Sequence, residues 1–295
     1  MLKGALVAII TPFMNDEVDE EGLRELIEFQ ITNGTDGIVP CGTTGESATL
    51  SHAEHKRVIE ITVDQVKKRV PVVAGAGSNN TKEAIELTLH AKAAGADGAL
   101  HITPYYNKPT QEGLFRHFEA ISSAAGGYPL VPYNIASRTG VNILPATMAR
   151  IADLPGVVAV KEASGDLTQM AEIQALCGDK VALLSGDDGL VLPVLAIGGK
   201  GVISVVNNIV PAEVSKMVAD FLAGRVAEAQ AAAMKLVPLV KAMFVETNPI
   251  PVKVAAYLMG LIRSGELRLP LCQPQPASLA LMKTAMTAYG LTVKE

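Results

Sequence analysis

Short apolar runs without polar alternation recur along the chain up to residue 206. The runs are ALVAII, GIVPCG, PVVAGAG, GALHIT, PLVPYNI, VVAVKEASG, VALLSG and GVISVV. Continuous apolar runs of this length are typical of parallel strands that are buried on both faces. Amphipathic segments lie between them, as at residues 23–34, 51–69 and 81–95. The pattern therefore predicts parallel strands that alternate with helices.

One short phrase occurs twice, as NGTDGIV at 33–39 and as AGADGAL at 94–100. A glycine is the usual residue where a helix ends in the left-handed conformation. We expect both copies to form the same joint, in which a helix ends, the chain turns and the next strand begins.

Alternating strands and helices without a linker favour one (β/α)₈ TIM barrel over two doubly wound domains. We expect residues 1–222 to form the catalytic barrel, and residues 223–295, whose pattern is helical only, to form a C-terminal helical extension packed on it. The segment VVAGAGSNNTKEAIEL at 72–87 is close to a dinucleotide fingerprint. It lacks the third glycine, and no acidic residue closes the strand that follows, so the barrel is the better interpretation.

Composition narrows the classes of partner. The formal net charge is -5, and no basic run is longer than the three residues Lys67, Lys68 and Arg69. This gives no electrostatic reason to expect nucleic acid or a membrane surface as a partner. Local basic side chains can still bind small anionic metabolites.

The three cysteines and the first residues bear on the compartment. Cys41, Cys177 and Cys272 lie far apart without a CxxC pair, so we expect no disulfide framework and no metal site. The N-terminal apolar run is broken early by Thr11 and Pro12 and has no cleavage motif after it, which favours a first strand over a signal peptide. We expect a cytoplasmic protein.

Lys161 ends the apolar run that begins at Val157. Active sites of TIM barrels lie at the C-terminal ends of the strands. Burial there lowers the pKa of an amine, because the ammonium form loses more hydration than the free base. A neutral amine can attack a ketone and form a Schiff base. A structural ion pair with Glu162 or Asp187 is the alternative, and position alone leaves both open.

Other strand ends carry groups that suit the same chemistry. Tyr133 ends the preceding strand, so it should neighbour Lys161, where a phenol can move protons or simply pack on the rim. The CGTTGE loop offers N–H groups and the hydroxyls of Thr43 and Thr44 to a carboxylate, or caps a helix. Arg138 can bind a second carboxylate, although a loop arginine is usually exposed.

Several motifs together carry a resemblance to a known family. They are GTTGES at 42–47, PYYNKPTQEG at 104–113, YNIASRTG at 133–140, VKEASGD at 160–166, LLSGDD at 183–188, GGKGVISV at 198–205 and NPIPVK at 248–253. They resemble the 4-hydroxy-tetrahydrodipicolinate synthase family of the pyruvate-dependent class I aldolase superfamily. The resemblance covers essentially the whole chain, and Ala136 and Thr247 stand where the family often has proline.

The resemblance implies a lyase that makes 4-hydroxy-tetrahydrodipicolinate in the first committed step of the diaminopimelate route to lysine. Lys161 would form a Schiff base with pyruvate, and the enamine would attack L-aspartate 4-semialdehyde. Thr43 and Thr44 match residues that hold the pyruvate carboxylate, and Gly186 and Ile203 match residues that line the pocket.

It also implies a proton relay and an assembly. Tyr133, Thr44 and Tyr106 match the relay, with Tyr106 reaching in from a neighbouring subunit. Arg138 matches the residue that receives the carboxylate of the aldehyde substrate. Family members are typically homotetramers, built as dimers of dimers, and need no organic cofactor.

Seven further residues match the family's pocket for feedback inhibition by L-lysine. They are Ser47, Ala48, His52, His55, Asn79, Glu83 and Tyr105. Taken alone, the histidines read as surface residues without a third metal ligand. Glu83 alone reads as the partner of Asn80 in a capping box. With all seven present, we expect inhibition by lysine.

Two other functions stay open. Sister lyases for N-acetylneuraminate or 2-keto-3-deoxy sugar acids share the lysine and the tyrosine, but their substrates present hydroxyls where Arg138 lies. A barrel that binds a keto acid without turnover would have no use for Lys161 beside Tyr133.

Overall fold

The computed structural model describes residues 2–294, and a sheet of eight parallel strands forms its centre. The strands are β1 (Gly4–Ala8), β4 (Gly37–Val39), β5 (Val73–Gly75), β6 (Gly98–Ile102), β7 (Leu130–Asn134), β8 (Ala159–Glu162), β9 (Ala182–Ser185) and β10 (Gly201–Ser204). Their order is β4-β1-β10-β9-β8-β7-β6-β5, and a bridge between Ile38 and Val72 joins the two end strands. The predicted TIM barrel is therefore confirmed.

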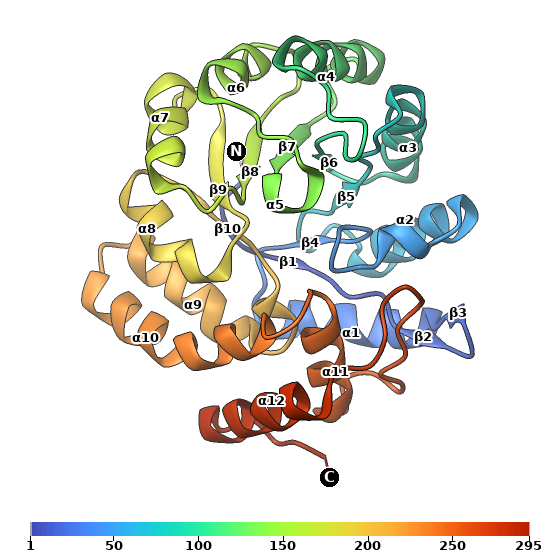
Figure 1. Ribbon diagram of the computed structural model, residues 1–295, viewed down its shortest axis with the longest axis vertical. Coiled ribbons are helices and arrows are strands. Elements are labelled where there is room, and N and C mark those ends of the chain that lie inside the picture. The colour runs from blue at the N-terminus through green and yellow to red at the C-terminus, as the bar shows by residue number, and fades with distance from the viewer. Residues whose placement is uncertain (1, 295) are drawn as a thin grey trace.

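Helices surround this ring of strands (Figure 1). They are α1 (Glu20–Thr32), α2 (His52–Val66), α3 (Thr81–Ala94), α4 (Gln111–Ala125), α5 (Ala136–Thr139), α6 (Pro145–Ala152), α7 (Leu167–Cys177), α8 (Val191–Ala196) and α9 (Pro211–Leu222). The three amphipathic segments singled out in the sequence form α1, α2 and α3.

The strands read as continuous apolar runs because both of their faces are buried. Leu6 on β1 belongs to the cluster inside the barrel, whereas its neighbours Ala5 and Val7 pack in the layer under the helices. On β8, Ala159 faces the interior and Val160 faces the helix layer. Alternation along a strand then turns Lys161 inward.

The repeated sequence phrase does form the same joint twice. Gly34 and Gly95 adopt left-handed φ values of 82° and 91° just after α1 and α3. The aspartate that follows each glycine then accepts a backbone N–H from a neighbouring strand segment. Asp36 binds Ala5 at 2.7 Å and Asp97 binds Val72 at 2.9 Å.

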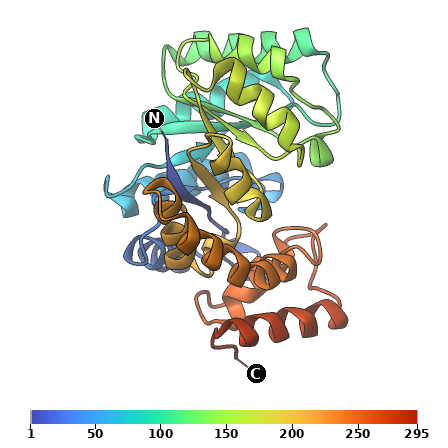
Figure 2. The same cartoon turned by 90° about the vertical axis from the view of Figure 1, so that its left-hand side faces the viewer.

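After α9 the chain is helical, with α10 (Val226–Met243), α11 (Ile250–Leu258) and α12 (Pro276–Tyr289). These helices stack on one side of the barrel, with α12 outermost (Figure 2). Leu239, Met243 and Met282 share a continuous core with Leu23 of α1. We propose the domain boundary between residues 222 and 223, in the turn between α9 and α10.

Two small elements were missed in the sequence. A hairpin of β2 (Phe13–Met14) and β3 (Glu17–Val18) follows β1. Its turn residues Asn15 and Asp16 have φ values of 55° and 62°, and an Asn-Asp pair between short apolar segments is a usable signal for such a turn. The other missed element is α5. None of the helices within residues 2–294 combines the length and hydropathy needed to cross a membrane.

Candidate active site

Lys161 lies inside the barrel with its amine against an aromatic face. Its side chain is almost fully buried, and Nζ is 4.1 Å from the centroid of the Tyr133 ring. Burial lowers the pKa of this amine to about 8, while the nearby Asp188 carboxylate opposes the shift. An amine of this kind is partly neutral near physiological pH, as Schiff-base formation requires.

The alternative of an ion pair is wrong. Within residues 2–294, no carboxylate comes within ion-pair distance of the Lys161 amine. Glu162 points to the helix layer, where Asn134 Nδ2 and the backbone N–H of Ser164 donate to it at 3.0 and 2.7 Å. Asp187 instead accepts from the backbone N–H of Gly189 at 2.7 Å.

Strand pairing places Tyr133 beside Lys161, as the sequence predicted. The two residues are direct partners in the parallel register of β7 and β8. Burial raises the pKa of the Tyr133 phenol to about 12, with the Arg138 charge opposing the shift. The phenol is therefore protonated at neutral pH and able to donate.

Gly186 borders the Lys161 side chain, and Ile203 lies elsewhere in the barrel interior. A Cβ at Gly186 would lie 3.0 Å from Cε of Lys161 and 2.8 Å from Cβ of Ala163, so only glycine leaves room for the lysine side chain. Ile203 is fully buried on β10 in the interior cluster that also contains Tyr133. Gly186 therefore leaves the space that the lysine side chain occupies.

The turn at residues 42–47 presents the two threonines. Thr43 lines a cavity, and Thr44 is buried, with its Oγ1 accepting from Asn248 Nδ2 at 3.0 Å. Because that oxygen accepts from Asn248, the hydroxyl hydrogen of Thr44 is free to donate elsewhere.

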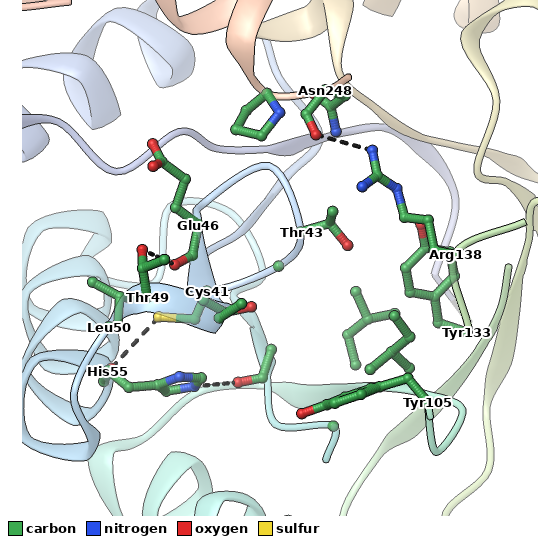
Figure 3. Close-up of a pocket in the computed structure, with 18 of the residues that line it drawn as sticks. Cys41, Thr43, Glu46, Thr49, Leu50, His55, Tyr105, Tyr133, Arg138 and Asn248 are labelled. Carbon is green, nitrogen blue, oxygen red and sulfur yellow. Dashed lines mark hydrogen bonds between the residues drawn. The ribbon is translucent and has the colours of Figure 1, made fainter. Parts of the chain in front are cut away.

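Arg138 reaches the same cavity from α5. Its Nη2 donates to the backbone oxygen of Asn248 at 2.9 Å (Figure 3). Its other guanidinium donors have no partner within residues 2–294 and can bind a ligand. Asn248 thus contacts both Arg138 and Thr44. It was missed in the sequence, because no single-sequence signal shows that an asparagine so far along the chain reaches the barrel mouth.

The cavity has a volume of about 460 Å³ and connects two groups of residues. Its lining includes Thr43, Tyr133 and Arg138, together with Ser47, Ala48, His52, His55, Glu83 and Tyr105 from the residues that match the lysine pocket. Tyr133 and Arg138 lie on the side opposite His55 (Figure 3). Lys161, Thr44, Gly186 and Ile203 are deeper and do not line it, and neither does Asn79.

Tyr106 is a predicted site residue that lies outside the cavity of its own chain. Its side chain is 89% exposed, and it does not line the cavity. Its backbone adopts a φ of 72°, in the left-handed region that is uncommon for a non-glycine residue.

The second group of residues is held by polar contacts. His52 Nε2 lies 2.7 Å from Glu83 Oε1, and His55 Nε2 lies 2.7 Å from the backbone oxygen of Gly75. Asn79 Nδ2 donates to the backbone oxygen of Tyr105 at 3.1 Å. Within residues 2–294, no group of three His, Cys, Asp or Glu side chains could hold a metal ion.

The capping-box interpretation of Glu83 is wrong. Asn80 does cap α3, by accepting from the backbone N–H of Lys82 at 3.1 Å. The Glu83 carboxylate turns away from this cap toward His52 and the hydroxyl of Ser78. A carboxylate placed in this way faces the cavity instead of closing the helix end.

Comparisons with known proteins agree with this geometry. A model of the dihydrodipicolinate synthetase family matches residues 1–288. A 4-hydroxy-tetrahydrodipicolinate synthase of Syntrophus aciditrophicus (strain SB) is 59% identical over 291 residues, which cover 99% of each chain.

Two solved structures are similar over nearly the full chain. Dihydrodipicolinate synthase from Acinetobacter baumannii, complexed with pyruvate, is 42% identical with a TM-score of 0.96, covering 99% of this chain and 100% of that one. The enzyme from Cyanidioschyzon merolae with lysine bound is 40% identical with a TM-score of 0.95, covering 98% of each. The chain is a lyase and belongs to the dihydrodipicolinate synthetase family.

Proposed function

We propose that this protein condenses pyruvate with L-aspartate 4-semialdehyde to give 4-hydroxy-tetrahydrodipicolinate. The observation that carries the proposal is the buried Lys161 amine, whose pKa is about 8 and which lies 4.1 Å from the centroid of the Tyr133 ring. The Syntrophus aciditrophicus relative bears the name of this activity, and the Acinetobacter baumannii enzyme binds pyruvate.

The first step joins pyruvate to the enzyme. The neutral Lys161 amine attacks the C2 ketone of pyruvate, and the resulting carbinolamine loses water to give an iminium ion. The carbinolamine oxygen must receive a proton before it leaves as water. Tyr133 is protonated and adjacent, and Thr44 can pass a proton to it, so we assign these two residues to the relay.

The second step forms the carbon–carbon bond. Loss of a proton from C3 of the iminium ion gives an enamine, whose C3 attacks the aldehyde carbon of the second substrate. The aldehyde oxygen takes up a proton and becomes the product hydroxyl. The amino group of the second substrate then displaces Lys161 from C2, which closes the ring and frees the enzyme.

The carboxylates of the two substrates need separate partners. We assign the pyruvate carboxylate to the turn at Thr43 and Thr44, and Gly186 and Ile203 to the lining of the pocket. Arg138 presents its guanidinium to the cavity and suits the carboxylate of the aldehyde substrate by paired hydrogen bonds. Tyr106 is assigned to the relay of a neighbouring subunit, since its own chain leaves it exposed.

Reduction with borohydride tests the proposal. Treatment with pyruvate and borohydride, followed by peptide mass spectrometry, should give a pyruvate-derived adduct on Lys161 alone. The absence of an adduct would favour a binding protein without turnover. Initial rates with pyruvate and aspartate semialdehyde, compared with cleavage of sugar acids, then separate this function from that of a sister aldolase.

We also propose that L-lysine inhibits the enzyme through the second group of residues. Glu83 offers a carboxylate to the lysine ammonium group, with His52 2.7 Å from it, and Asn79 and Tyr105 are further candidate partners. The Cyanidioschyzon merolae enzyme has lysine bound. Millimolar lysine should lower the initial rate of the wild type, and Glu83→Gln should weaken this effect without changing the rate in its absence. A lysine-insensitive wild type would contradict the proposal.

We further propose an assembly of two tight dimers and a cytoplasmic location. Tyr105 and Tyr106 are exposed side by side in the single chain, at 40% and 89%. Aromatic residues are enriched at protein interfaces. Sedimentation of the wild type and of a Tyr106→Ala variant tests the assembly, because loss of an interface anchor should shift the variant toward smaller species.

A further inference from the structure

A buried ion pair joins the C-terminal extension to the turn that carries Thr43 and Thr44. Nζ of Lys253, on α11, lies 2.6 Å from Oε1 of Glu46, and both side chains are fully buried. Such pairs contribute little net stability compared with apolar residues of similar size, because both charges lose their hydration. The geometry around the pair indicates what else it does.

The Glu46 carboxylate is held from two directions. Lys253 contacts one oxygen, and the backbone N–H of Arg268 donates to the other at 3.2 Å. The ring of Phe13 lies against both cations, 3.8 Å from the Lys253 amine and 4.2 Å from the Arg268 guanidinium carbon. These contacts hold the Glu46 carboxylate in one position.

The backbone of Glu46 is strained. Its φ of 53° lies in the left-handed region, as does the φ of 55° at Cys41, so one such residue precedes the turn and the other lies within it. Non-glycine residues persist in this region only where their surroundings hold them, and such strain gathers at functional sites. The backbone N–H of Glu46 also donates to the backbone oxygen of Thr43 at 3.1 Å. The conformation of Glu46 therefore helps to fix the conformation of the turn.

The same segment of the extension meets the other substrate-binding groups. Asn248, five residues before Lys253, contacts the Thr44 hydroxyl and the Arg138 guanidinium. Residues 248–253 therefore contact Thr44, Arg138 and Glu46 from one short stretch of chain.

We propose that Lys253 and Glu46 are a positioning pair, through which helix α11 holds the Thr43–Thr44 turn in the conformation that binds the pyruvate carboxylate. The proposal rests on the proposed function. Neither residue is assigned to bind the substrate, so the pair acts through the turn, on pyruvate affinity and on the placement of Thr44, and it leaves the Lys161 side chain itself unchanged.

The double variant Glu46→Gln/Lys253→Met tests this role, because it removes both charges and leaves neither unpaired in the interior. Its matched control is Glu20→Gln/Arg57→Met, which removes an ion pair of 2.6 Å whose side chains are about half exposed. We expect the double variant to fold with a Tm near that of the wild type. Because Thr44 also belongs to the proposed relay, kcat should fall as well, but by a smaller factor than the rise in KM for pyruvate. Its KM for pyruvate should rise at least tenfold, whereas the control keeps the wild-type KM.

A folded double variant with the wild-type KM for pyruvate would overturn the proposal, since a purely structural pair would behave in that way. Should the double variant not fold, Glu46→Asp keeps both charges and shortens the arm by one methylene, and it must raise the same KM. If the proposed function itself is wrong, the wild type will show no turnover with pyruvate and aspartate semialdehyde, and no KM can be measured. The pyruvate concentration for half-maximal borohydride trapping then replaces KM.

Discussion

At the scale of the residue, the chemistry depends on how burial changes the Lys161 amine. Its pKa falls from 10.5 to about 8, and the Tyr133 phenol beside it shifts upward to about 12. Burial disfavours the charged form of both groups, so one cause places a partly neutral amine beside a neutral phenol, as the roles proposed for them require. The same burial has a cost in stability.

Lys161→Met should abolish turnover and raise the free energy of unfolding. The folded-state pKa lies below the unfolded value, so the penalty for burying the amine is fully present below pH 8 and disappears as the pH rises above 10.5. The shift in pKa corresponds to a loss of about 3 kcal/mol in the free energy of unfolding at pH 7. Thermal unfolding at pH 7 should show a Tm several degrees above the wild type, and the difference should shrink at pH 10.

The control for this variant is Lys82→Met, at an exposed position on α3. Removing an exposed charge changes little. A Lys161→Met protein that is less stable than the wild type at pH 7 would show that the amine is not held in a desolvated state.

The rate of pyruvate capture should follow the neutral fraction of Lys161. kcat/KM for pyruvate is expected to rise about tenfold per pH unit on the acidic side and to level off near pH 8. No descending limb from Tyr133 should appear below about pH 11, because its pKa is about 12. An acidic limb centred near pH 10 would mean that the amine is solvated as in water.

At the scale of the element, sequence periodicity was sufficient for the barrel but not for the turns. Short apolar runs such as residues 157–160, placed between amphipathic segments, favour strands with two buried faces. Alternation along such a strand turns Lys161 inward beside Tyr133. The hairpin at Asn15 and the four-residue helix α5 escaped prediction, because segments this short carry no period.

Part of the candidate site could likewise be predicted from the sequence, and part could not. Lys161, Tyr133 and the threonine turn follow from their places at strand ends, which any barrel brings together. Asn248 and Lys253 reach the mouth from α11 and the turn before it, and contacts across 204 and 207 residues depend on how the extension docks. Nothing in a local pattern reports that docking.

Ala136→Pro should stabilise α5 and the placement of Arg138. Ala136 is the first residue of this helix, where proline is favoured, and its backbone N–H makes no intramolecular hydrogen bond with residues 2–294. We expect about 0.5–1 kcal/mol of added stability and a lower KM for aspartate semialdehyde. Ala136→Gly is the matched control and should change both quantities in the opposite direction. An unchanged KM in both variants would show that α5 is already rigid.

At the scale of the whole molecule, the relay role proposed for the exposed Tyr106 would make the single chain incomplete as a catalyst. If a neighbouring subunit supplies this phenol, two defective chains can repair each other. Co-expression of Lys161→Ala with Tyr106→Phe should therefore recover roughly a quarter of wild-type activity, since random pairing gives half hybrids with one complete site in two.

Each variant expressed alone provides the baseline for this measurement. Purification through two different tags isolates the hybrid, and its activity per site can be compared with that of each parent. A hybrid no more active than the mean of its parents would place Tyr106 in the relay of its own chain.

Closure of the barrel also constrains how the protein is made. β1 pairs with both β4 and β10, so the first strand of the chain finds its second neighbour only when residues 201–204 have been synthesised. Until then the nascent chain carries open strand edges on the ribosome, and such edges favour aggregation. Translation speed and chaperone supply over the first two hundred codons should therefore govern the yield of this enzyme more than its final stability does.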